Sequence, residues 1–287
     1  MRIHKAFSSA LLLAALAATA CGGPARREYS LQGQVLSVSE DRKEANIKHE
    51  AIAGFMPAMT MPYKARDAEE FSGLQPGDLI NATLVLISND AYLENVKKVG
   101  EAPIEKAPEA TPTASSGFEL LKPGEAVPNT RFTDQDGRER EFGSFKDSTV
   151  VVTFIYTRCP MPDFCPLMDR HFATLQAALK ADPALRNVHL VSVSFDPIAD
   201  TPPVLKKHAD ALGADPAYWT FLTGDRDEID RFASRFGVTL TRGMSEQLDI
   251  AHNLRTAIVD PKGALVKSYT GNAWTPAQLL ADLRPVG

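Results

Sequence analysis

The sequence has few cysteines, few tryptophans and no excess of basic residues. Its 287 residues include three cysteines and two tryptophans, and the formal net charge is -5. The acidic balance, without a basic stripe bearing interleaved aromatic residues, gives no support to nucleic-acid binding. Two of the cysteines stand close together, but no second pair exists to complete a structural zinc site. The hydrophobic content of 44% is ordinary for a globular protein.

Beyond the N-terminus, no segment is apolar and long enough to cross a membrane. Residues 1–20, MRIHKAFSSALLLAALAATA, have a basic start and a short apolar run, which is typical of a secretory signal peptide. Small residues lead directly into Cys21, as in a bacterial lipoprotein cleavage site, where Cys21 becomes the acylated N-terminus. Cleavage without lipidation is the alternative. Either route predicts a mature chain in the bacterial cell envelope, on the periplasmic side, where cysteines can be oxidised.

A segment without aromatic residues divides the mature chain. Residues 101–117, EAPIEKAPEATPTASSG, are rich in Pro, Ala, Glu and Ser/Thr. Such a composition cannot bury a core and predicts a semi-extended linker. The sequence therefore predicts two domains, residues 28–100 and residues 118–287.

The first predicted domain reads as all-β. Apolar and polar residues alternate in several short segments separated by turn signals. These segments are QGQVLSV at 32–38, EANIKHE at 44–50, LINATLVLI at 79–87 and AYLENVKKV at 91–99. About five short strands in this length predict a small, OB-like barrel.

The second predicted domain alternates strands and helices. A hairpin around Asp136-Gly137 precedes a continuous apolar strand, TVVVTFIYT, and a second hairpin, RTAIVDPKGALVKSY, precedes the closing helix TPAQLLADL. The helix between the first strand and the next carries one apolar face, formed by Met168, Phe172, Leu175 and Leu179. This order of elements predicts a thioredoxin-like α/β domain.

The segment RCPMPDFCP holds Cys159 and Cys165 with five residues between them. Cys159 follows the buried strand and Cys165 begins the next helix, at the edge of an open α/β sheet where active sites gather. A helix N-terminus stabilises a thiolate, and thiolates suit Cu(I). In a thioredoxin-like fold the loop before the last hairpin lies beside this loop, so His252 is the candidate third ligand.

Other interpretations of this region remain open. Cys159 and Cys165 could form a purely structural disulfide, or the domain could be a peroxiredoxin-like peroxidase. Met161 at the loop tip is a further candidate thioether ligand, whereas Met168 is expected in the core. Asp196 is either a strand-end cap or a partner that orients a ligand. The remaining histidines of this domain are expected to be solvated: His171, His189 and His208.

Residues 118–287 resemble the SCO/SenC family of copper-binding thioredoxin-like proteins. The matching segments are TFIYTRCP and CPLM around the cysteines, VSFDPIADTPPVL, and the His252 loop with VDPKG after it. The resemblance implies a Cys2His site for Cu(I) or Cu(II) and a role in assembling the copper centre of cytochrome c oxidase. The family usually has three residues between its cysteines, and this chain has five.

Three of the seven methionines lie within GFMPAMTMPY, at positions 56, 59 and 61. Met59 and Met61 share a face of a strand, and His49 ends the neighbouring strand. Thioethers with one imidazole form a soft, neutral set suited to Cu(I) or Ag(I). The alternative is that the methionines fill the core of a small barrel.

Residues 30–100 resemble the CusF-type periplasmic copper/silver chaperone domain, a small β-barrel. The resemblance rests on IKHEAIAGFMPAMTMPY and implies His49, Met59 and Met61 as ligands. Where that family has a tryptophan over the metal, this chain has Met56. Met56 then becomes a further ligand, or Phe55 provides the cover.

The whole sequence predicts an extracytoplasmic, lipid-anchored copper chaperone. In this hypothesis the barrel captures Cu(I), and the second domain holds it or delivers it to the copper-bearing subunit of cytochrome c oxidase or to another copper protein. The fusion suggests copper transfer between the two domains. The competing hypotheses are an enzyme, a thiol-disulfide oxidoreductase using Cys159 and Cys165, and a periplasmic copper buffer for resistance.

Overall fold

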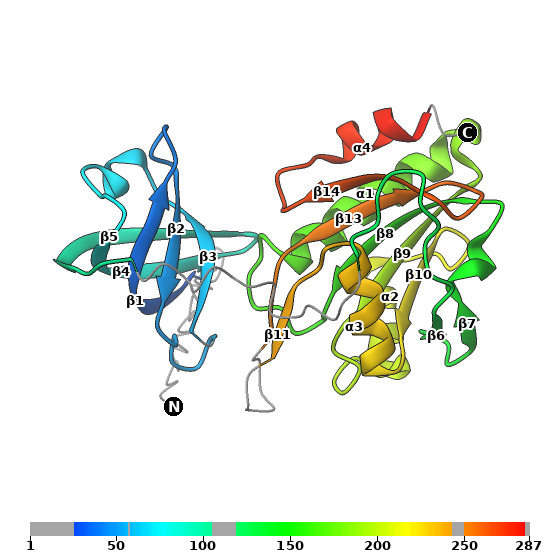
Figure 1. The fold of residues 1–287 in the computed structure, drawn as a ribbon, viewed down its shortest axis with the longest axis horizontal. Coiled ribbons are helices and arrows are strands. Elements are labelled where there is room, and N and C mark those ends of the chain that lie inside the picture. Colours follow the sequence, from blue (N-terminus) through cyan, green and yellow to red (C-terminus); the bar gives the residue numbers. More distant parts are fainter. Residues whose placement is uncertain (1–25, 57, 105–118, 243–249, 285–287) are drawn as a thin grey trace, which may run out of the picture.

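The computed structural model describes residues 26–56, 58–104, 119–242 and 250–284. Its strands form two large sheets, one in each half of the chain, and the two halves lie side by side (Figure 1). The predicted signal peptide, Cys21 and most of the linker lie outside the described residues. Within those residues, no helix is both long and apolar enough to span a membrane.

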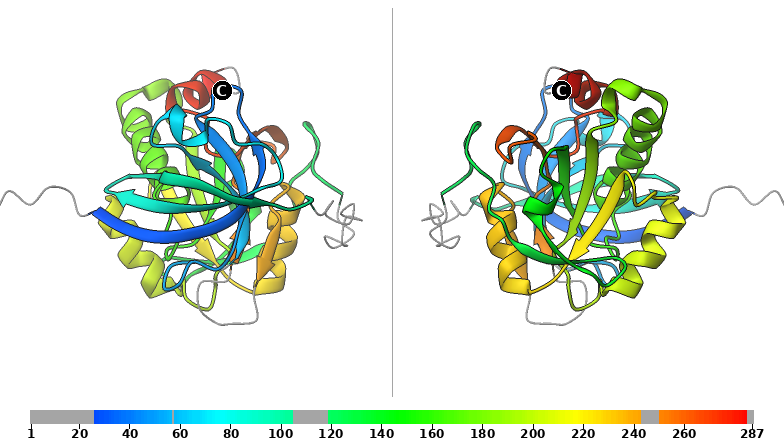
Figure 2. Two further views of the ribbon diagram at one scale, coloured as in Figure 1. Left: turned by 90° about the vertical axis from the view of Figure 1, so that its left-hand side faces the viewer. Right: turned by 90° about the vertical axis from the view of Figure 1, so that its right-hand side faces the viewer.

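The first half is an antiparallel sheet of five strands in the order β3-β2-β1-β4-β5. In Figure 2, left, this sheet faces the viewer with the rest of the molecule behind it. The strands are β1 (Arg26–Val38), β2 (Glu44–His49), β3 (Met59–Lys64), β4 (Asp78–Ile87) and β5 (Asp90–Glu101), with a 3-10 turn at Ala68–Phe71. A bridge between Ala65 and Leu93 also joins the chain after β3 to β5. The predicted all-β character is confirmed, and closure into a barrel stays a prediction.

The register of β2 on β3 places the candidate ligands of the first half on one face. His49 pairs with Met59, and Ile47 pairs with Met61. Directly opposed residues of an antiparallel pair project to the same face, and alternate residues share it. The neighbouring strand β1 approaches β2 closely at Gly33, where a Cβ would lie 2.8 Å from the carbonyl oxygen of Lys48. Position 33 therefore has no room for a side chain.

The second half is built on a sheet of seven strands in the order β14-β13-β8-β9-β10-β6-β7. Its strands are β6 (Arg131–Asp134), β7 (Glu139–Glu141), β8 (Thr149–Ile155), β9 (Val188–Ser194), β10 (Trp219–Thr223), β13 (Arg255–Val259) and β14 (Leu265–Thr270). Strands β11 (Leu240–Arg242) and β12 (Ile250–His252) form a separate pair. The helices are α1 (Cys165–Ala181), α2 (Pro202–Leu212), α3 (Arg226–Arg235) and α4 (Pro276–Leu283), with 3-10 turns at Phe142–Phe145 and Pro183–Leu185. The predicted elements appear in the predicted order, and the β11–β12 pair before the last hairpin was not predicted.

Helices cover both faces of this sheet. Thr153 and Phe154 are neighbours on β8 and so point to opposite faces. The Thr153 hydroxyl bonds that of Thr256, which also meets the sulfur of Met168 on α1. Phe154 packs instead against Phe232 of α3. The predicted apolar face of α1 is confirmed, since all four of its residues are buried in the core between α1 and the sheet.

The prediction that three histidines of this half are solvated is wrong. His208 bonds the Asp169 carboxylate at 3.0 Å, and His189 bonds the Thr220 hydroxyl at 2.8 Å. The His171 ring centroid lies 4.6 Å from that of Trp274. Each side chain is partly buried because it faces a neighbouring element rather than solvent.

Candidate metal centre

The cysteine loop connects β8 to α1 at the carboxyl end of the parallel strands. Cys165 is buried as the first residue of α1, whereas Cys159 is partly buried, and both thiols are free. A buried carboxylate fixes the approach to this loop. Asp200 accepts from the backbone N–H of Thr157 at 2.9 Å and from the hydroxyls of Thr157 and Ser194. The chain leaving β8 is therefore held before it reaches the cysteines.

Asp196 supports the loop, and its side chain also accepts from the backbone N–H of Ala199 at 3.4 Å, just after β9. Its carboxylate accepts from the guanidinium of Arg158 at 2.6 Å. Because Arg158 directly precedes Cys159, this ion pair also restrains the first cysteine. The contacts of Asp196 fit both predicted roles, which stay predictions.

His252 ends β12 and brings its ring to the cysteine loop. Its Nε2 lies 3.8 Å from the Cys165 sulfur, and its Nδ1 lies 2.9 Å from the carbonyl oxygen of Asn253. Because only a protonated Nδ1 can donate to that carbonyl, Nε2 carries the lone pair that faces the thiol. Burial lowers the pKa of His252 to about 4, so the imidazole is neutral at pH 7.

The two thiols differ in their readiness to ionise. The hydrogen bond from the Cys165 thiol lowers the pKa of Cys159. Burial raises the pKa of Cys165 well above its ordinary value. Cys159 is therefore the first thiolate of the pair, and Cys165 must lose a proton when it binds a metal ion.

The three predicted ligands of this half are neighbours rather than a preformed cage. Cys165 contacts both other side chains, through the thiol of Cys159 and the imidazole of His252. Among the described residues, no three His, Cys, Asp or Glu side chains are already arranged to hold a cation. The thiols and imidazole are nevertheless the soft donors that Cu(I) prefers.

In the first half, His49 is the candidate imidazole ligand, as His252 is in the second half. Its side chain is 2% exposed, and Nδ1 lies 2.7 Å from the carbonyl oxygen of Glu50. Within the described part of the chain, the buried Nε2 has no hydrogen-bond partner. Burial lowers the pKa of His49, which keeps the ring neutral. An orphaned, neutral imidazole nitrogen fits a soft metal ion.

The methionines stand beside this histidine. Met59 is partly buried opposite His49, and Met61 is buried two residues further along β3. Met56 is also buried, and its sulfur accepts from the Tyr63 hydroxyl at 3.7 Å. Phe55 stacks on Tyr29, with ring centroids 4.3 Å apart.

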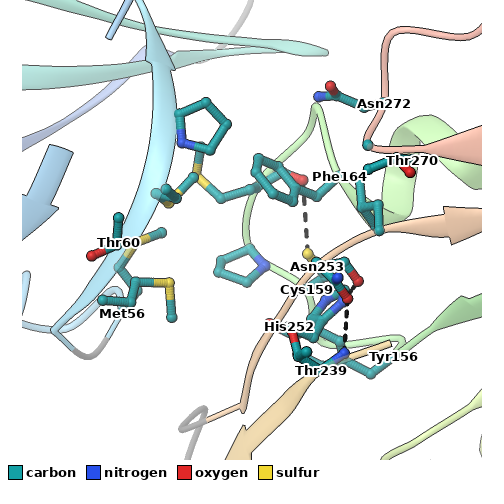
Figure 3. Close-up of a pocket in the computed structure, with 17 residues that line it drawn as sticks. Met56, Thr60, Tyr156, Cys159, Phe164, Thr239, His252, Asn253, Thr270 and Asn272 are labelled. Atoms are coloured by element: carbon teal, nitrogen blue, oxygen red, sulfur yellow. Dashed lines mark hydrogen bonds between the residues drawn. The ribbon is translucent and has the colours of Figure 1, made fainter. Parts of the chain in front are cut away.

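One cavity of about 360 Å³ joins the two candidate sites. Its walls come from both halves, and Figure 3 shows Met56 and Thr60 across the cavity from Cys159 and His252. Met59 and Met61 also line it, and so do Tyr156 and Met161. The sequence predicted both groups of ligands, but not that they face each other. The unusually long loop between the cysteines was the available signal.

Comparison with known proteins identifies both halves. Residues 122–286 match the SCO1/SenC family, and residues 28–98 match the family described as copper binding periplasmic protein CusF. The SCO1 protein homolog of Bacillus subtilis is 33% identical over 155 residues, which are 53% of this chain and 78% of the relative.

The solved structures that are similar to the second half include two Sco-family proteins. A SCO1/SenC family lipoprotein from Bacillus anthracis is 27% identical with a TM-score of 0.52, covering 58% of this chain and 99% of that one. BsSco, described as a member of the Sco family of cytochrome c oxidase assembly proteins with a disulfide switch, is 31% identical with a TM-score of 0.50. That match covers 58% of this chain and 98% of BsSco. These similarities confirm the predicted thioredoxin-like fold, and the chain belongs to the SCO1/SenC family.

Proposed function

We propose that this protein is an extracytoplasmic copper chaperone with two copper sites. The observation that carries the proposal is the single cavity with soft donors on opposite walls. One group, which we call the cysteine wall, binds copper through Cys159, Cys165 and His252. The other group, the methionine wall, binds it through His49, Met59 and Met61, with Met56 as a further ligand.

The donor chemistry supports copper over harder ions. None of the described residues that line the cavity is an aspartate or a glutamate. Ca²⁺ and Mg²⁺ need such oxygen ligands, whereas thioethers, thiolates and imidazole select Cu(I). The neutral donors of the methionine wall also suit Ag(I), and the imidazole of the cysteine wall also tolerates Cu(II). The similarity of residues 28–98 to a copper binding periplasmic family supports the same conclusion.

Copper is the cargo, and ligand exchange moves it. Cys159 offers the first thiolate, and Cys165 releases its proton as its sulfur joins the metal. His252 adds an imidazole nitrogen without losing a proton, because Nε2 already carries a lone pair. The family suggests the recipient, since the related BsSco is described as a cytochrome c oxidase assembly protein. The client is then the copper-bearing subunit of that oxidase or another copper protein.

The same comparisons support the predicted location. One similar structure is described as a lipoprotein, and the family matched by the first half is described as periplasmic. We propose that the chain lies in the cell envelope and that acylation of Cys21 anchors it to the membrane.

Anaerobic titration of the full chain with Cu(I), read by X-ray absorption, tests the function. The expected result is two equivalents, one with two sulfurs and one nitrogen from the cysteine wall. Cys159→Ser/Cys165→Ser should remove one equivalent and Met59→Leu/Met61→Leu the other. A chain that binds no Cu(I), or keeps both equivalents in both variants, refutes the proposal.

A specific observation favours a second candidate, a thiol-disulfide oxidoreductase. The more acidic Cys159 is partly exposed beside the buried Cys165, and BsSco is described as having a disulfide switch. The Cys159 thiolate would attack a client disulfide and release one client thiol. Cys165 would then displace the second thiol and leave a Cys159–Cys165 disulfide, so that two electrons reduce the client.

His252→Ala separates the two functions. If this variant still binds copper at the cysteine wall, and client disulfide reduction is lost only in the cysteine variants, the oxidoreductase is correct. If copper binding at that wall falls with His252, the chaperone is correct. A copper buffer without an oxidase client is distinguished by a deletion strain that loses copper tolerance but keeps oxidase activity.

A further inference from the structure

The loop between Cys159 and Cys165 does more than carry the cysteines. We infer that it docks the methionine wall onto the cysteine wall, so that Cu(I) passes between them within one chamber, the cavity that both walls line. This inference rests on the proposed copper function. It adds a device that neither half has alone.

The first contact is apolar. Met161 lies between the two cysteines, yet its side chain is buried among the core residues of the first half, together with Met56 and Met61. It is only 5% exposed. Cys159 and Phe164 pack against the cores of both halves. A side chain of the cysteine loop therefore completes the core beneath the methionines.

The second contact is ionic. The Asp163 carboxylate lies 2.7 Å from the ammonium of Lys64, the last residue of β3. The Asp163 carbonyl accepts from the Asn272 side chain at 2.9 Å, which fixes the loop to the second half. The Asp163 side chain is 11% exposed and that of Lys64 is 50% exposed, so the carboxylate end of the pair is shielded from solvent and the ammonium end is not. Since β3 carries Met59 and Met61, the ion pair sets the distance between the two walls.

The chamber makes transfer a simple exchange of ligands. A bond from copper to a methionine sulfur breaks as a bond to the Cys159 sulfur forms, and any proton on that thiol leaves to solvent. Copper stays Cu(I), so the step needs no oxidant or reductant. An ion released by one wall meets the donors of the other at a raised local concentration, as in any tethered pair of sites.

The test uses the full chain and variants outside both ligand sets. Lys64→Asp sets two carboxylates against each other, and Lys64→Asp/Asp163→Lys restores the pair with reversed charges. Lys180→Asp is the matched control, because Lys180 pairs with Asp215 at 2.8 Å and is 43% exposed, against 50% for Lys64. Met161→Ala removes the apolar contact and leaves the charges in place, and Met161→Leu, which keeps an apolar side chain but has no thioether, should match the wild type.

Each protein is loaded with one equivalent of Cu(I), and its release to excess bathocuproine disulfonate is timed. Lys64→Asp and Met161→Ala should release copper about 10-fold faster than the wild type. The charge-reversed double variant should return toward the wild-type rate, and Lys180→Asp should match it. Equal release from wild type and Lys64→Asp overturns the inference while leaving the copper sites intact.

A metal-free measurement keeps docking separate from copper binding. Zero-length carbodiimide coupling should join Lys64 to Asp163 in the wild type and give a crosslinked peptide by mass spectrometry. Failure to take up Cu(I) with this crosslink present refutes the proposed function but not the docking. Absence of the crosslink in a copper-binding chain refutes the docking.

Discussion

His49 and His252 have the same local arrangement in two unrelated folds. Each sets Nδ1 against the carbonyl oxygen of the next residue, at 2.7 Å for His49 and 2.9 Å for His252. Each therefore leaves a lone pair on Nε2, which in His252 lies 3.8 Å from the Cys165 sulfur and in His49 has no hydrogen-bond partner among the described residues. The sulfur differs, because His49 stands opposite a thioether and His252 beside a thiol. A thioether binds a metal ion without releasing a proton, whereas a thiol loses its proton when it binds. Copper binding should therefore depend on pH at the cysteine wall and not at the methionine wall.

The two walls also differ in how they are held. His49, Met59 and Met61 lie on strands paired by a regular antiparallel ladder. Cys159 lies in a loop held by side chains, chiefly Asp200 and the Arg158–Asp196 pair. Changes at single side chains should therefore disturb the cysteine wall more than the methionine wall.

Removing a thiol should give the largest effect. Cys165→Ser, studied in the Met59→Leu/Met61→Leu background, should lower the Cu(I) affinity by at least ~100-fold, more than the loss of an outer partner of a ligand typically costs. With both thiols present, the affinity should rise between pH 6 and pH 8, because binding releases protons. Competition with a Cu(I) chelator measures both. A pH-independent affinity at the cysteine wall would contradict the contrast between the walls.

Loss of the buried carboxylate comes next. Asp200→Ala leaves the Thr157 N–H and two hydroxyls without their acceptor, and each unsatisfied buried group costs about 1–3 kcal/mol. Urea unfolding should therefore show a loss of roughly 2 kcal/mol or more. The control is Asp227→Ala, an exposed carboxylate on α3, with an expected cost below about 1 kcal/mol. Similar losses in the two variants would show that Asp200 does not hold the loop.

A smaller effect is expected at the methionine wall. Met61→Leu keeps the volume and the strand but removes one thioether. In the Cys159→Ser/Cys165→Ser background it should weaken Cu(I) binding by about 10-fold, or ~1.4 kcal/mol, with little change in stability. The remaining affinity should not change between pH 6.5 and pH 8. Unchanged affinity would mean that Met61 only fills the core.

The smallest expected effects are opposite pH dependences in the two halves. Burial lowers the pKa of His208, but the bond to Asp169 outweighs it and the pKa rises above 6.5. Its stabilisation is complete below pH 6.5 and is lost as the pH rises through the folded-state pKa. Burial lowers the pKa of His49, so folding favours the neutral ring. The stabilisation from this neutral ring is complete above pH 6.5 and is lost as the pH falls below 6.5.

Urea unfolding of the copper-free chain at several pH values checks these signs. The stability difference between wild type and His208→Gln should shrink as the pH rises from 6 to 8, by less than about 1 kcal/mol. The acid-side loss should be smaller in His49→Gln than in the wild type. A His208→Gln difference that grows with pH would reverse the assigned sign.

Much of this architecture was predictable from local patterns. Alternation along β2 and β3 predicted that Met59 and Met61 share a face, because the period of a strand is a local property. The apolar face of α1 followed from helical spacing in the same way. The place of His252 beside Cys165 required a fold, and the thioredoxin-like order of elements supplied it.

The shared chamber was not predictable by these means. Lys64 and Asp163 are 99 residues apart, and their contact depends on how two separately folded halves meet. The packing of Met161 into the core of the first half was not predictable either, because nothing in the sequence reveals which core receives it. The partly buried histidines were missed for the same reason, since His208 faces Asp169 on another helix.

Gly33 is not a ligand of the proposed copper site on the methionine wall, but a substitution there should disturb that site. It pairs with His49 across β1 and β2, and any added Cβ would meet the Lys48 carbonyl and the Ile47 side chain. Even the smallest side chain would have to push β2, and the displaced backbone carries His49. In a mutational screen for copper handling, substitutions at position 33 should therefore resemble ligand substitutions, and a protein engineer should leave this glycine unchanged.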